Sequence, residues 1–152
     1  MTTITLPLSI ASYALLSSYC LCGGIFEHLS VFRGWLHIHE PGQLKALQAA
    51  SGYGALYTYV IPKAALTFFN AYLLVTNPTG IYERTRLGLK VGLAMLLVSW
   101  TSSAFIQVPL QLRIQKTGDP ALVKRLERTT WTRTVAMVLH GCSVGWILMG
   151  AF

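Results

Sequence analysis

The sequence predicts an all-α integral membrane protein, folded as a single domain with a bundle of four transmembrane helices. Of its 152 residues, 53% are hydrophobic and only 11% are charged, whereas a soluble domain would carry roughly 25% charged residues. Long stretches without Asp, Glu, Lys or Arg recur along the chain, and crossing a hydrocarbon core takes about 20 apolar residues. Because these apolar runs are continuous rather than alternating, they favour helices over the strands of a barrel.

Four apolar stretches place the helices. The first runs from Ile4 to Phe26, the third from Val91 to Leu112 and the fourth from Thr134 to Phe152. The second, Ala46–Tyr82, is too long for one span, so the helix stop Asn77-Pro78 marks its end. We therefore expect helices at about residues 5–30, 55–77, 88–112 and 131–151.

Basic residues divide unequally between the two sides of this bundle, which predicts its orientation. One side has only Arg84, Arg86 and Lys90 beside two charge-free termini. The positive-inside rule then places both long loops in the cytoplasm and both termini on the non-cytoplasmic side. The formal net charge of +7 needs no nucleic acid, because anionic lipid headgroups can balance it. The basic residues of the two long loops are Arg33, Lys45, Arg113, Lys116, Lys124, Arg125, Arg128 and Arg133.

Two shorter features concern the ends of helices. Residues 1–26 hold no Lys or Arg, so we expect the first span to be retained rather than cleaved as a signal peptide. In the last loop, Asp119 is a predicted N-cap and Pro120 suits the first helical position. We expect the cationic helix that starts there to run into or against the fourth span.

Polar residues recur at helical spacing within the apolar runs, so each predicted helix carries one polar stripe. In lipid such side chains must face protein or a cavity, and the four stripes should converge on the axis of the bundle. The stripes are Tyr13, Ser17, Cys20, Gly24 and Glu27; Tyr59, Lys63, Thr67 and Asn70; Trp100, Ser103, Gln107 and Gln111; and Arg133 with His140.

Lys63 is the most unusual member of these stripes, because it places a charge inside an apolar run. The segment "FEHLSVF" permits the first helix to continue past Glu27 to Phe32. We therefore expect Glu27 to be the partner of Lys63. Such a pair can be a structural latch between helices, but the density of ionisable and amide groups in the stripes favours a functional pocket.

Three motifs resemble a group of small four-helix membrane proteins that borders on the anthrone-oxygenase-like proteins of polyketide pathways and on DoxX-like proteins. They are "GGIFEHLSVFRGW" (23–35), "WTSSAFIQVPLQLRIQKTGDPALVKRL" (100–126) and "WTRT" (131–134). The resemblance implies a four-helix membrane fold and an activity on a lipophilic aromatic or ketonic substrate. The positions that it singles out are Glu27, His28, Pro109, Gln111, Trp131 and Arg133.

Cofactor-free oxygenation of that kind begins with removal of a proton from carbon, followed by stabilisation of the enolate. Glu27, His28 or His140 could be the base, and Lys63 and Arg133 could hold the oxyanion; these five are the candidate catalytic residues. The same chemistry suits an isomerase or cyclase, and we expect no cofactor and no metal. The candidate substrate-binding residues are Tyr59, Asn70, Trp100, Gln107, Gln111 and Trp131.

Other functions are less well supported by the residues. His37, His39 and Glu40 form a short His-x-His-Glu segment, but two histidines do not complete a zinc site. A haem between His28 and His140 is disfavoured because their expected depths differ. The main alternative is a non-catalytic accessory subunit of a larger membrane complex, since the chain is only 16.7 kDa with short loops. Whether it forms a homo-oligomer stays open.

Overall fold

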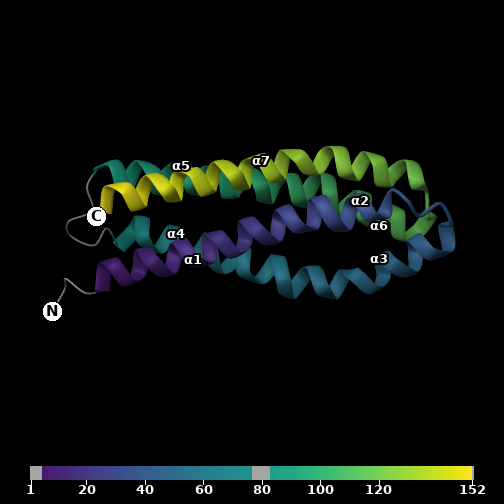
Figure 1. Ribbon diagram of the computed structural model, residues 1–152, viewed down its shortest axis with the longest axis horizontal. Helices are drawn as coiled ribbons and strands as arrows, with labels where there is room; N and C mark the ends of the chain where they lie inside the picture. The colour runs from purple at the N-terminus through teal and green to yellow at the C-terminus, as the bar shows by residue number, and fades with distance from the viewer. Residues whose placement is uncertain (1–4, 77–82, 152) are drawn as a thin grey trace.

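The computed structural model describes residues 5–76 and 83–151, and within these ranges the chain is helical with short turns and no strands. This confirms the predicted all-α class. Helical segments join end to end into long stretches (Figure 1). The segments are α1 (Thr5–Phe26), π-helix η1 (Glu27–Phe32), α2 (Arg33–Trp35), α3 (Pro41–Ala55), π-helix η2 (Leu56–Val60), α4 (Ile61–Thr76), α5 (Glu83–Ser102), π-helix η3 (Ser103–Gln107), α6 (Val108–Thr117) and α7 (Pro120–Ala151).

Two of the π-helices have a cause in the sequence. Proline has no N–H, and its ring clashes with the carbonyl four residues earlier. For Pro62 that carbonyl belongs to Thr58 in η2, and for Pro109 it belongs to Phe105 in η3. The wider turn of a π-helix accommodates the ring within a continuous helix. Segments of this kind often lie at functional sites, and the predicted site residues within them are Glu27, His28, Tyr59 and Gln107.

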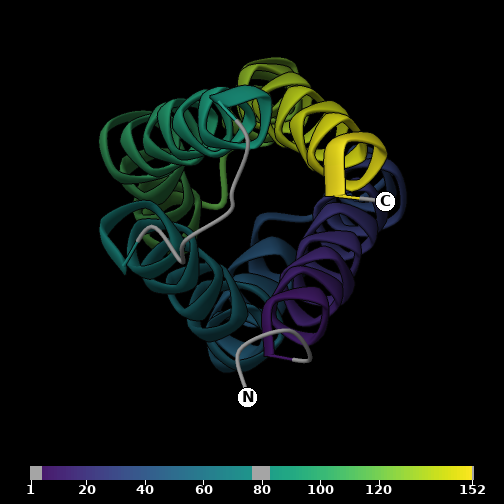
Figure 2. The same cartoon turned by 90° about the vertical axis from the view of Figure 1, so that its left-hand side faces the viewer.

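The helices surround a common axis when the molecule is seen from one end (Figure 2). α7 packs along α5 and α1, α4 packs on α5 and α1, and α3 packs on α6. The buried apolar residues form two clusters, one near each end. The first includes Tyr13, Leu66, Leu96 and Met137, and the second includes Phe32, Leu44, Ile114 and Leu126.

A polar layer separates these two apolar clusters. On each stretch of helix, at least one polar or charged residue lies between the two clusters. These residues are Glu27 between Cys20 and Phe32, Tyr59 and Lys63 between Leu44 and Leu66, Trp100 between Leu96 and Leu110, and Arg133 between Leu126 and Met137. Each predicted stripe therefore contributes at least one residue to this layer.

Among the described residues, three helices are long and apolar enough to cross a membrane: Leu8–Trp35, Leu56–Thr76 and Thr85–Thr117. Large apolar side chains such as Phe68, Val75 and Phe105 are strongly exposed, as expected of a surface that faces lipid. The predicted fourth span, Thr134–Phe152, is not among the three. Its last residue lies outside the described part of the chain, as do Ile4 at the start of the first stretch and the predicted helix stop Asn77-Pro78.

The helical stretches extend beyond the predicted ranges. The chain is helical from Pro41 instead of about residue 55, and the cationic helix expected from Pro120 is continuous with the fourth predicted span, as α7. The start at about residue 55 came from counting one membrane-spanning length back from Asn77-Pro78, whereas a helix can continue past the hydrocarbon region wherever its residues have good helix propensity. The expected start of α7 is confirmed, because Asp119 Oδ1 accepts a hydrogen bond from the Ala121 N–H at 2.8 Å.

The close packing of α5 on α7 depends on Gly88, and its replacement tests this part of the fold. A Cβ atom at Gly88 would lie 2.7 Å from Ile147 Cγ1, whereas one at Gly145 would meet nothing within 4 Å. We expect Gly88→Ala to lower the free energy of unfolding by about 1–3 kcal/mol and Gly145→Ala to leave it equal or slightly higher. Denaturant unfolding in detergent measures both, and equal effects would contradict this packing.

Candidate functional site

The first pair of charges in the polar layer joins η1 to α7. Arg133 Nη2 donates a hydrogen bond to Glu27 Oε2 at 2.8 Å, and the two side chains are 5% and 17% exposed. The predicted ion pair between Glu27 and Lys63 is therefore wrong. The fork of the guanidinium reaches the carboxylate, whereas Lys63 Nζ makes no hydrogen bond to it. Both predicted charges nonetheless lie in the same layer.

Lys63 is fully buried, and its Nζ atom has no hydrogen-bond partner in the described structure. It lies 4.4 Å from the centre of the Trp100 ring and 5.1 Å from that of the Tyr59 ring. Cation–π contacts of this kind attract a charge that lacks an anion. The Trp100 ring is itself fixed, because its Nε1–H donates to Thr67 Oγ1 at 3.0 Å, and Thr67 in turn donates to the Lys63 carbonyl at 2.8 Å.

Tyr59 links the two cations. The Arg133 Cζ atom lies 4.7 Å from the centre of the same ring, so the ring contacts both the guanidinium and the ammonium group. The Tyr59 hydroxyl lies close enough to Ser99 to interact with it, but neither hydroxyl makes a hydrogen bond of good geometry. This layer therefore holds two cations and one carboxylate around an aromatic ring, an excess of positive charge in an apolar environment.

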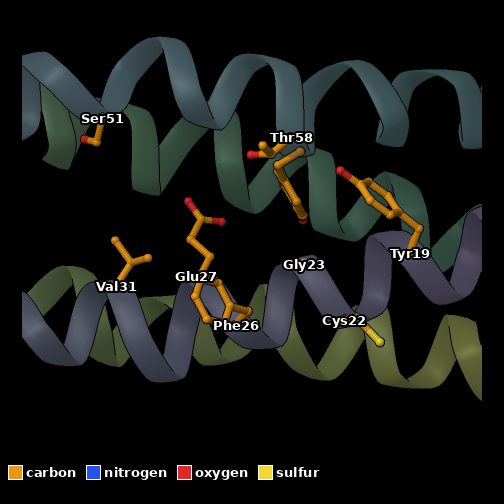
Figure 3. A pocket seen from close by; sticks show the side chains of 9 residues that line it. Tyr19, Cys22, Gly23, Phe26, Glu27, Val31, Ser51 and Thr58 are labelled. Atoms are coloured by element: carbon orange, nitrogen blue, oxygen red, sulfur yellow. The ribbon is translucent and has the colours of Figure 1, made fainter.

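A pocket of 510 Å³ adjoins this charged layer (Figure 3). It lies between α1 and η1 on one side and α3 and η2 on the other, and the Glu27 side chain points into it (Figure 3). Tyr59 also lines it, so the carboxylate and the aromatic ring meet any occupant. We call it the Glu27 pocket; its other lining residues are Tyr19, Cys22, Gly23, Phe26, Val31, Ser51 and Thr58.

Two further pockets continue from the Glu27 pocket towards α6. The first has a volume of 210 Å³ and shares Glu27 and Ser51 with it. The second, of 390 Å³, shares Gln48 and Gln111 with the first. We call them the inner and the outer amide pocket. The predicted substrate-binding residue Gln111 thus lies at the junction of these two pockets.

His28 and Trp131, both predicted site residues, lie together on a different face of η1 and α7. His28 is fully buried, with its Nδ1 2.8 Å from Thr134 Oγ1 and its ring centre 4.4 Å from that of Trp131. Its Nε2 lies 3.7 Å from Glu127 Oε1, which also lies 3.9 Å from Arg33 Nε. Within the described residues, His28 does not line the Glu27 pocket.

His140 and Asn70 lie in a third group, within the apolar cluster that contains Tyr13. His140 Nδ1 lies 3.1 Å from the Gly92 carbonyl, which can only accept, so Nδ1 carries a proton. His140 Nε2 lies 3.2 Å from Ser17 Oγ, and Asn70 Nδ2 donates to the Tyr13 hydroxyl. This group is buried, both ring nitrogens of His140 have partners, and Asn70 Oδ1 has no hydrogen-bond partner among the described residues. Neither His140 nor Asn70 lines the pockets described above.

The last predicted residue, Gln107, is held within its own helix. Its side chain is buried and hydrogen-bonds with Ser102 and Ser103 at 3.4 and 3.3 Å. Among the described residues, no three His, Cys, Asp or Glu side chains lie close enough to hold a metal ion. The side chains that the fold gathers in and beside the pockets are one carboxylate, an arginine, a lysine, one phenol ring and several amides.

Sequence reasoning missed two residues beside these groups. Gln48 lies in a segment that was expected to be mostly loop, so it was never placed on a helix face. Glu127 lies on α7 among basic residues, and its acidic charge in that setting was the available signal. Both are partly or largely buried.

Comparisons with protein-family models, with curated proteins and with solved structures gave no match to this chain. The function is therefore argued from the geometry of these residues.

Proposed function

We propose that the protein is a small membrane enzyme that removes a proton from carbon in a lipophilic ketone. The observation that carries this proposal is Lys63, a fully buried lysine whose Nζ has no hydrogen-bond partner among the described residues and which packs on the Tyr59 ring beside the pocket that Glu27 enters. A buried charge is costly unless it is paired. An unpaired cation is useful where negative charge develops during a reaction.

Glu27 is the base in this proposal. It binds Arg133 through Oε2, so Oε1 accepts the proton from the substrate carbon. The electron pair of that C–H bond moves to the carbonyl oxygen, giving an enolate. Arg133, which binds Glu27, and Lys63, which packs on the Tyr59 ring, do not line the pocket themselves. They stabilise the enolate from a short distance by their positive charge.

Two outcomes of the enolate fit this site. Return of the proton from Glu27 to another carbon completes an isomerisation without any co-reactant. Attack of dioxygen on the carbanionic carbon leads to oxygenation, as the sequence resemblance to anthrone-oxygenase-like proteins implies. Proton abstraction is common to both, and it is the step to test.

Anthrone, a lipophilic polycyclic ketone, is a suitable probe for that step. Purified protein in lipid nanodiscs should speed the exchange of the anthrone methylene protons in D₂O without oxygen, compared with empty nanodiscs. In air it should also speed the conversion of anthrone and O₂ to anthraquinone and water. Mass spectrometry and an oxygen electrode follow the two reactions, and no acceleration of exchange would overturn the proposal.

Gly23 and Gly34 offer a matched pair of variants to locate the reaction. Gly23 lines the Glu27 pocket and Gly34 does not, and a Cβ atom at either meets nothing within 4 Å. Gly23→Phe should slow the exchange about tenfold, because its ring takes up part of the substrate volume. Gly34→Phe should leave it unchanged, and equal rates for the two variants would place the reaction elsewhere.

We further propose that the chain crosses the membrane four times with both termini on the non-cytoplasmic side. In support, α1 begins and α7 ends at the same end of the molecule (Figure 1), as an even number of crossings requires. The basic loops favour the cytoplasm for the opposite end. A reporter fused after Phe152 should report a non-cytoplasmic location, and a cytoplasmic signal would reverse this orientation.

A further inference from the structure

Gln48 lies where the two amide pockets meet, and its side chain is incompletely satisfied. It belongs to α3, is 9% exposed and lines both pockets. Its Oε1 atom has no hydrogen-bond partner among the described residues. A buried acceptor that is left unpaired costs free energy, so the pocket is better suited to an occupant that donates a hydrogen bond to this atom.

Gln111 faces the same space from another helix. It belongs to α6 and also lines both amide pockets. Two carboxamides from different helices thus border one cavity, and a carboxamide can both accept and donate hydrogen bonds. Because Glu27 lines the inner amide pocket as well, one molecule can reach the carboxylate and the two amides at once.

We propose that the substrate carries a neutral hydroxyl group that binds to Gln48, at a distance from the carbon that reacts at Glu27. This inference rests on the proposed function, since it describes the substrate of the same site. A hydroxyl donates to Gln48 Oε1 and still accepts from a neighbouring amide, whereas a carbonyl or an ether can only accept. The substrate is therefore a lipophile with two polar ends, one reactive and one for recognition.

The test compares two probes, an alcohol and its methyl ether, of which only the alcohol can donate a hydrogen bond. They are tritiated 2-(2-naphthyl)ethanol and its methyl ether, which share a neutral aromatic body. Binding to the protein in nanodiscs is measured by scintillation proximity and corrected with empty nanodiscs. The wild type should bind the alcohol about tenfold more tightly than the ether, because the ether leaves a buried acceptor unpaired.

Variants assign that preference to one side chain. Gln48→Leu should remove the preference for the alcohol and leave the affinity for the ether nearly unchanged. Gln43→Leu is the matched control, because Gln43 is exposed on the same helix and does not line the amide pockets; it should keep the tenfold preference. A preference that persists in Gln48→Leu, or that is absent in the wild type, would overturn the assignment.

The outcome is independent of the exchange assay. If the wild type does not prefer the alcohol over the ether, but Gly23→Phe still slows the proton exchange of anthrone, the hydroxyl site is wrong and the proposed enzyme stands. If the preference depends on Gln48 but no exchange occurs, the binding site is upheld and the proposed proton transfer fails.

Discussion

Replacement of Glu27 by glutamine should lower the free energy of unfolding by about 3–5 kcal/mol, because it leaves a buried arginine without its anion. Arg133 is only 5% exposed and donates to Glu27 Oε2 at 2.8 Å. With the carboxylate neutral, Arg133 and Lys63 would face one Tyr59 ring as two like charges. Denaturant unfolding in detergent measures the loss.

A double-mutant cycle shows whether this loss belongs to the pair with Arg133. The double variant Glu27→Gln/Arg133→Met should lose less free energy of unfolding than the two single variants lose together. In the double variant both charges are gone, so no buried charge is left without its partner. Glu27→Gln with Lys63→Met is the matched cycle, and it should show a smaller coupling because Lys63 makes no hydrogen bond to Glu27. Strict additivity for Glu27 and Arg133 would contradict the pairing.

Helical periodicity predicted the polar stripes but not which of their members share one layer, because Asn70 and His140 lie in another group. Glu27, Tyr59, Lys63 and Arg133 each fall on a predicted stripe, and the structure brings these four together. Periodicity does not give the rotation of one helix relative to another. A prediction from periodicity also assumes a regular α-helix, whereas Glu27–Phe32 and Leu56–Val60 are π-helical. For these two reasons, the prediction that Glu27 pairs with Lys63 rather than with Arg133 was wrong.

The two predicted histidines show a second limit of predicting a site from sequence. His28 and His140 are both fully buried, but each is hydrogen-bonded within its own group, to Thr134 and to Gly92 with Ser17. In a sequence, a polar residue in a membrane helix looks the same whether it lines a pocket or satisfies a neighbour. Only the tertiary contacts separate the two situations, and their role in catalysis stays a prediction.

Gln48 is a site residue that a search for membrane spans does not find. Gln48 lies within the apolar stretch Ala46–Tyr82, but the predicted span was counted back from Asn77-Pro78 and so began at about residue 55, whereas α3 continues directly into η2. The amide pockets exist because this helix packs on α6. A helix outside the three candidate membrane spans therefore supplies part of the amide pockets, and a search for membrane spans carries no signal for it.

Replacement of Lys63 by methionine should produce a protein that is more stable but slower. The ammonium group is fully buried without a hydrogen-bond partner, and an apolar side chain of similar length should raise the free energy of unfolding by about 1–4 kcal/mol. The rate at which the protein exchanges the methylene protons of anthrone should fall about thirtyfold. A unit charge about 8 Å from the enolate oxygen contributes about 2 kcal/mol at an effective dielectric constant of about 20, which corresponds to that factor in rate.

The opposite signs of these two effects distinguish a functional cation from a structural one. If Lys63 only held helices together through its contacts with Trp100 and Tyr59, methionine would lower stability, and activity would fall only as the folded fraction falls. Lys90 is the matched control, because it is exposed on α5, and Lys90→Met should change neither quantity. A Lys63→Met protein that is less stable than the wild type, or equally stable and fully active, would remove the main support for an enzyme, because the unpaired charge would then have no role in stabilising an anion.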